Sequence, residues 1–217
     1  LLSENTKEIT FKAMSYGINN YINYPINQQE LLTYLKKYEY VLKSRKPNPN
    51  TPKRVSPIRH SITIGNELKK VPEIVESLVS KIHPALANYK CDIQLGLQEL
   101  IVNAIEHGNL AISYEEKALA LQEGSFEKLL EKKKKDDVFK NKRVTVEFHQ
   151  EQSYNEWTIN DEGNGFDPCK ISSFSKDSEW IHGRGIMLCR FLFDEIQYFN
   201  EGRSIRVRRY VPKNEQS

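Results

Sequence analysis

Three polar side chains, Glu99, Asn103 and His107, recur at four-residue spacing in a segment that also has a strong apolar face. Because an α-helix returns to nearly the same face after four residues, we expect them to form one stripe. An asparagine carbonyl oxygen suits Mg²⁺, which keeps most of its waters and takes few protein ligands. A glutamate one turn earlier could accept a hydroxyl proton. An exposed polar face is the alternative interpretation of the stripe.

A second segment, Asp161-Glu-Gly163-Asn-Gly165, follows a predicted strand. An ionised aspartate only accepts hydrogen bonds, as recognition of an exocyclic amine requires. The two glycines permit sharp turns and let the backbone approach a ligand closely. Taken alone, this segment could equally be an ordinary turn.

A third segment places Gly183 and Gly185 at the start of an apolar helix, where free N–H groups bind phosphate. His182 and Arg184 add optional positive charge. The segment matches neither the Rossmann fingerprint nor the phosphate loop of GxxxxGK[ST] proteins. Together the three segments indicate a metal and nucleotide site: a metal-binding helix, an acceptor for an amine and a phosphate-binding helix start.

Two layers of secondary structure are expected to position these segments. Alternating apolar and polar residues predict strands at 58–64, 143–148, 156–160, 194–199 and 204–211. Helical spacing of apolar residues predicts helices at 67–88, 92–107 and 185–193. Pro72 must lie in the first turn of the first helix or break it. The charged segment 113–137 predicts two further helices that separate at Gly124 and Ser125.

Composition restricts the class of protein. The chain has 217 residues and a net charge of +3, with basic and acidic residues interleaved, which argues against nucleic acid as a partner. No apolar run reaches the roughly 20 residues of a membrane span, and no signal peptide begins the chain. The three scattered cysteines form no CxxC pair, so we expect a reducing cytoplasm. The chain does not begin with Met, which favours a piece of a longer protein.

The order of the three segments resembles the N, G1 and G2 boxes of the GHKL ATPase superfamily, over roughly residues 59–211. Within this superfamily, the sequences of the three motifs are most similar to those of anti-sigma-factor serine kinases of the RsbW and SpoIIAB type. The resemblance implies a Bergerat-type fold: an α/β two-layer sandwich whose mixed, mainly antiparallel sheet packs on helices. It implies an ATP-binding kinase domain at 58–213, with a charged helical insert at 111–142.

The resemblance also implies roles for single residues. Glu99 would be the catalytic base, and Asn103 would hold Mg²⁺. Asp161 would bind the adenine amine, and Ser204 would reach the adenine directly or through water. The remaining expected nucleotide contacts are His107, Gly163, Gly165, Gly183, Arg184 and Gly185.

Three further segments bear on domain organisation and function. Residues 1–45 resemble the last third of a response-regulator receiver domain, but Tyr24 stands before Pro25 where that family has Lys, so phosphate sensing is doubtful. Residues 46–57, rich in proline, would be a linker. The insert at 111–142 would be an exposed helical hairpin or a docking surface for a partner, and its run Lys132–Lys135 favours a solvated helix end over a binding patch.

Three functions remain open. The first is a Mg-ATP-dependent serine kinase that acts on an anti-sigma-antagonist protein of the STAS type. The second is a module in which nucleotide controls the binding of a sigma factor or another partner without catalysis. The third is a histidine-kinase catalytic domain, although His60 and His83 fit poorly as phosphoacceptors. Glu99 favours the first, because a pure binder has no need of it. The resemblance also allows a homodimer.

Overall fold

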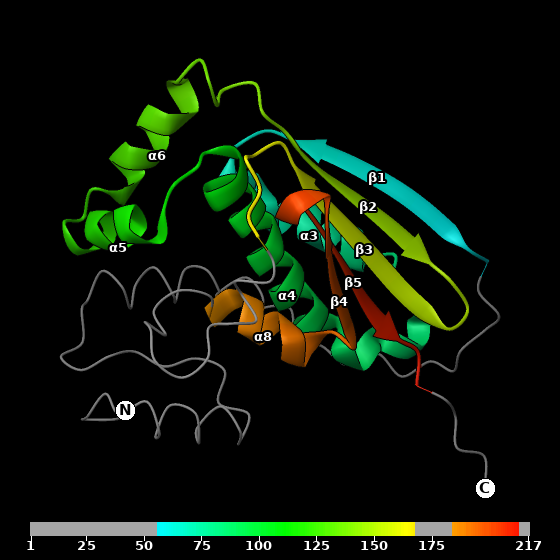
Figure 1. Cartoon of the computed structure of the whole chain (residues 1–217). Helices are drawn as coiled ribbons and strands as arrows, with labels where there is room; N and C mark the ends of the chain where they lie inside the picture. The colour runs from blue at the N-terminus through cyan, green and yellow to red at the C-terminus, as the bar shows by residue number, and fades with distance from the viewer. Residues whose placement is uncertain (1–55, 168–183, 213–217) are drawn as a thin grey trace, which may run out of the picture.

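The computed structural model describes residues 56–167 and 184–212, where a five-stranded sheet packs against helices (Figure 1). The strands are β1 (Ile58–Ile64), β2 (Val144–Gln150), β3 (Tyr154–Asp161), β4 (Glu195–Phe199) and β5 (Ser204–Tyr210). They lie in the order β1-β2-β3-β5-β4, and each neighbouring pair is antiparallel. The predicted two-layer sandwich is confirmed. The receiver-like segment 1–45 and nearly all of the linker 46–57 lie outside the described residues.

Alternation along the strands separates a core face from an open face. Val146, Phe148, Trp157, Ile159 and Val207 are fully buried against the helices. Phe148 and Trp157 are register partners on β2 and β3, and their rings stack with centroids 5.3 Å apart. Residues between these positions are polar, which is the pattern of a sheet with one solvated face.

Helices α3 (Val71–Val79), α4 (Lys90–Asn103) and α8 (Arg184–Leu192) cover the core face (Figure 1). Gly96 of α4 allows α8 to come close, because a Cβ there would overlap the ring of Phe193. The Sγ atom of Cys189 also lies 3.6 Å from the carbonyl oxygen of Gly96. This close packing fixes the position of α8 relative to α4.

The predicted helix at 67–88 is shorter than expected. Pro72 lies in the first turn of α3, which is one of the two positions that the sequence analysis allowed. A short 3₁₀ helix, η1 (Leu68–Lys70), precedes α3. Helix α3 ends at Val79, and a second 3₁₀ helix, η2 (Pro84–Tyr89), begins after His83. The Nδ1 atom of buried His83 accepts a hydrogen bond of 3.2 Å from the backbone N–H of Ala85. Pro84 has no backbone N–H to donate, so α3 cannot continue through this position as one long α-helix.

The insert forms the two predicted helices, α5 (Tyr114–Gln122) and α6 (Phe126–Lys135), beside the main body (Figure 1). Gly124 separates them with a left-handed φ of 67°. Lys132 and Lys135 at the end of α6 are exposed, while Lys134 pairs with Glu131 at 2.7 Å. In residues 56–167 and 184–212 we find no helix with the length and apolar character that crossing a membrane requires.

Candidate functional site

Helix α4 presents the first predicted pair of site residues. Glu99 is only 6% exposed, and its Oε1 atom accepts a hydrogen bond of 3.3 Å from Nδ2 of Asn103. This bond commits the amide nitrogen of Asn103 to Glu99 and leaves the amide oxygen, Oδ1, as the atom that can ligate a cation. The Glu99 carboxylate and the Asn103 amide therefore lie side by side, as the four-residue spacing predicts.

The helix widens after Asn103. Residues Ala104–Asn109 form a π-helical turn, η3, and the N–H of Leu110 donates to the carbonyl of Ile105 at 2.9 Å, five residues earlier. The predicted α-helix at 92–107 is thus an α-helix to Asn103 followed by a π turn. Such turns frequently occur at functional sites, and His107 lies within this one.

His107 is held by its backbone surroundings. Its Nδ1 atom lies 2.7 Å from the carbonyl oxygen of Ile112. Because a carbonyl only accepts, Nδ1 carries the proton and Nε2 is the nitrogen left for a ligand. Burial lowers the pKa of His107 below its usual value, against the raising effects of the Ile112 bond and of Glu106 and Glu99. The imidazole is therefore neutral at pH 7.

Asp161, at the end of β3, lies against two glycines from different segments. A Cβ on Gly108 would come within 2.6 Å of Oδ1 of Asp161, and a Cβ on Gly163 would overlap the carbonyl of Gly108. The N–H of Gly163 donates to Oδ1 of Asp161 at 2.8 Å, which leaves Oδ2 as a further acceptor. The N-box end and the G1 segment therefore meet around one carboxylate.

Burial raises the pKa of Asp161, while the Gly163 amide and the charges of Lys142 and Arg203 lower it. The Asp161 side chain is half-buried in polar surroundings. A half-buried acceptor favours a ligand with a matching donor, because taking a carboxylate out of water without a partner is costly.

The G1 segment is fixed on its other side by the turn between β4 and β5. The N–H of Phe166 donates to the carbonyl of Glu201 at 2.7 Å. Gly165 has a left-handed φ of 73°, and a Cβ there would overlap the carbonyl oxygen of Glu201. Glycine is required at 165 for both reasons.

The start of α8, which the sequence analysis predicts to bind phosphate, lies against α4. Gly185 lies in the first turn of α8, and a Cβ on it would overlap the Glu99 carboxylate. The Glu99 carboxylate therefore borders the helix start that the sequence assigns to phosphate. His182, Gly183 and the side chain of Arg184 lie outside the described residues.

Ser204 does not join this cluster. It pairs in register with Asn160, while Ile205 next to it points into the core. Because side chains alternate along a strand, Ser204 lies on the face opposite Ile205 and Asp161. Its hydroxyl oxygen accepts a hydrogen bond of 2.8 Å from Nδ2 of Asn200 in the β4–β5 turn. In this geometry Ser204 supports the turn.

Asn109 is a residue of this region that sequence reasoning missed. Its Nδ2 donates to Oδ1 of Asn66 at 2.9 Å, and its Oδ1 accepts from the N–H of Glu162 at 2.9 Å. Asn66 in turn donates to the carbonyl of Phe139 at 2.9 Å. Both asparagines are buried. The only available signal was the position of Asn109 directly after Gly108.

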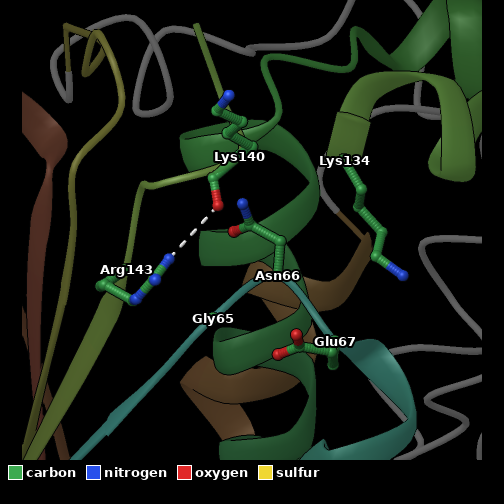
Figure 2. A pocket seen from close by; sticks show the side chains of 6 residues that line it. All are labelled: Gly65, Asn66, Glu67, Lys134, Lys140 and Arg143. Atoms are coloured by element: carbon green, nitrogen blue, oxygen red, sulfur yellow. Dashed lines mark hydrogen bonds between the residues drawn. The ribbon is translucent and has the colours of Figure 1, made fainter. Parts of the chain in front are cut away.

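A pocket of about 180 Å³ opens beside Asn66 at the base of the insert (Figure 2). Its lining consists of Gly65, Asn66, Glu67, Lys134, Lys140 and Arg143. Figure 2 shows the Arg143 guanidinium directed at the backbone carbonyl of Lys140, with Nη1 donating at 3.3 Å. None of the predicted site residues lines this pocket, so it is separate from the cluster around Glu99 and Asp161.

Two tyrosines were also missed. Tyr114, at the start of α5, lies with its ring centroid 4.0 Å from that of His107. The rings of Tyr198 on β4 and Phe166 form a T-shaped contact with centroids 5.5 Å apart. Burial raises the pKa of Tyr198 to about 12. Among the described residues, the buried Tyr198 hydroxyl has no hydrogen-bond partner. Nothing in the local sequence distinguishes either tyrosine from a packing residue.

The described side chains fit Mg²⁺ held together with phosphate. In the part of the chain that the structure describes, no three His, Cys, Asp or Glu side chains come together as a metal site. Mg²⁺ commonly binds through one or two protein oxygens plus phosphate oxygens and water. The Asn103 oxygen beside Glu99 and the start of α8 is a donor set of this kind.

The comparison with protein families agrees with this geometry. The model of the histidine kinase-like ATPase domain matches residues 49–209, which include every segment of the candidate site. No curated protein matches the chain. Family membership supports ATP binding and a regulator of the kinase type. Because the match covers well over half of the 217 residues, the chain belongs to the GHKL-type family of histidine kinase-like ATPase domains.

Proposed function

We propose that the protein is an ATP-dependent serine/threonine protein kinase of the anti-sigma-factor type, with Mg²⁺ as its metal. The observation that carries this proposal is the position of the Glu99 carboxylate. It lies between the Asn103 amide and Gly185 at the start of α8. A base for phosphoryl transfer must lie close to both the metal ligand and the phosphates, and the Glu99 carboxylate occupies such a position in this proposal.

Each residue has a role in this proposal. Asp161 accepts a hydrogen bond from the adenine amine through Oδ2, and Gly108 and Gly163 let their two segments close around this carboxylate. The amide oxygen of Asn103 would hold Mg²⁺, which would neutralise charge on the phosphates. His107 presents Nε2 to the phosphates, and the first turn of α8 offers its free N–H groups.

The chemical step uses Glu99. The substrate hydroxyl gives its proton to the Glu99 carboxylate as its oxygen forms a bond to the γ-phosphorus. The bond between the γ-phosphorus and the β,γ-bridging oxygen breaks, and ADP leaves with that oxygen. We propose that the hydroxyl belongs to an antagonist protein of the STAS type, that a sigma factor is the other partner, and that the kinase can act as a homodimer.

Transfer of label from [γ-³²P]ATP to a cognate antagonist protein tests the proposal. The unaltered chain with Mg²⁺ should label serine or threonine, and Glu99→Gln should abolish labelling while ATP affinity changes less than about threefold. Asp161→Asn should weaken ATP binding by about 10–100-fold, since it replaces an acceptor by a donor. The control is Asn141→Ala, an exposed position, which should alter neither.

Two results would contradict the proposal. If ATP binds tightly but no partner is labelled, the chain is a nucleotide-controlled binding module. If Glu99→Gln abolishes ATP binding itself, Glu99 is a binding residue and not the base.

A further inference from the structure

The first residues of the insert are joined to the end of the N-box segment by several contacts. The N–H of Ile112 donates to the carbonyl of Glu106 at 2.9 Å, and the carbonyl of Ile112 lies 2.7 Å from Nδ1 of His107. The ammonium group of Lys117 forms an ion pair with the carboxylate of Glu106, whose side chain is only 4% exposed. The insert is therefore anchored to the helix that carries Glu99 and Asn103.

Tyr114 occupies a rigid position in this anchor. It is the first residue of α5, directly after the capping residue Ser113. The hydroxyl of Ser113 accepts from the N–H of Glu116 at 3.1 Å, and the carboxylate of Glu116 accepts from the N–H of Ser113 at 2.8 Å. Lys133 of α6 adds a hydrogen bond to the carbonyl of Ala111 at 3.3 Å. A reciprocal capping box fixes the direction in which a helix begins.

The Tyr114 ring covers His107. The two ring centroids are 4.0 Å apart, with an angle of 38° between the planes. Since Nδ1 of His107 is committed to Ile112, the tyrosine ring and this bond together leave one orientation of the imidazole, with Nε2 as its open nitrogen. Burial raises the pKa of the Tyr114 phenol, and the nearby charges of Glu99 and Glu106 add to this effect.

We propose that Tyr114 is a positioning residue of the nucleotide site, which holds the His107 imidazole in the orientation that contacts phosphate. In this proposal the insert contributes a residue, Tyr114, to the ATP site. This inference rests on the proposed role of His107 in nucleotide binding. Fixing a side chain before the ligand arrives reduces the entropy lost on binding, so loss of the Tyr114 ring should weaken nucleotide affinity.

The test compares Tyr114→Ala with Tyr114→Phe in the whole chain. The first measurement is the NMR titration of His107 without nucleotide, and the second is the Kd for ADP with Mg²⁺. Tyr114→Ala should expose the imidazole and move its titration midpoint upward, and should raise the Kd by about fivefold. Tyr114→Phe keeps the ring and should leave both values near those of the unaltered chain.

Leu119→Ala, at a 57% exposed position of α5, is the control for general weakening of that helix and should change neither value. If Tyr114→Ala fails to fold, Tyr114→Leu takes its place with the same expectation. An unchanged His107 titration in the folded Ala or Leu variant would overturn the inference. Damage by Tyr114→Phe equal to that of Tyr114→Ala would also overturn it, because the hydroxyl would then be the acting group.

The two measurements separate this inference from the proposed function. The His107 titration needs no nucleotide, so it decides whether Tyr114 positions the imidazole even if the unaltered chain binds no ADP. Absence of ADP binding in the unaltered chain would count against the proposed function alone.

Discussion

Asn66 and Asn109, 43 residues apart in the sequence, are joined side chain to side chain by a hydrogen bond of 2.9 Å. Asn66 follows β1 and Asn109 ends the π turn. Through its second amide atom, Asn109 also holds the N–H of Glu162, next to Asp161. One buried amide pair thus links the end of the N box to the segment that carries Asp161.

This pair predicts a stability effect. Asn109→Ala should lower the free energy of unfolding by about 2–4 kcal/mol, because it leaves the Glu162 N–H and the Asn66 oxygen without their partner. Urea denaturation measures the change, with Asn141→Ala at an exposed position as the control. A loss no larger than that of the control would mean that water replaces the Asn109 amide at no cost.

The contact between Gly108 and Asp161 predicts an effect on ligand binding. Gly108→Ala should reduce ATP affinity by about 10–100-fold, since its Cβ would lie 2.6 Å from Oδ1 of Asp161 and displace the carboxylate. Isothermal titration measures the affinity. Gly124→Asn is the matched control: its position has open space around it and a left-handed φ that asparagine tolerates. ATP affinity unaffected by Gly108→Ala would remove Asp161 from the adenine site.

Burial of histidines predicts how stability depends on pH. The pKa of His107 is lowered by burial, and so is that of His83. The unfolded chain therefore binds more protons near the ordinary histidine pKa of about 6.5, and stability should be full above that pH and fall as the pH drops below it. Urea denaturation between pH 7.5 and 5.5 measures the slope.

His107→Gln should make this slope smaller, because it removes one of the two described histidines whose pKa is lowered. The residual slope should come from His83, whose ring lies elsewhere, at the start of η2. An identical slope in the variant would show that His107 has the same pKa in the folded and unfolded chains.

Much of the fold could be predicted because it depends on local patterns. Alternation along 144–150 and 154–161 identified neighbouring strands, and the spacing of Glu99 and Asn103 placed both on one helical turn. Glycines at 163 and 165 marked a segment in close contact with other backbone. These features follow from the period of the helix and strand and from the size of glycine.

Other features depend on tertiary contacts that no local pattern carries. The π turn is held by the bonds of Leu110 and Ile112 to earlier carbonyls, so the α-helical stripe ends before His107. The face on which Ser204 lies is set by its register with Asn160. Tyr114 reaches His107 only because the insert folds back on the N box. Each of these is a consequence of pairing between segments.

The insert meets the core at both of its ends: Lys117 pairs with Glu106 near the start, and the carbonyl of Phe139 accepts from Asn66 near the finish. Once both ends are fixed, each doubling of the chain between them costs only about 0.6 kcal/mol of closure entropy. The tip of the insert at Gly124, which has open space around it, can therefore change length at little cost. In a domain built this way, the insert can gain contacts to a new partner while the residues of the nucleotide site stay unchanged.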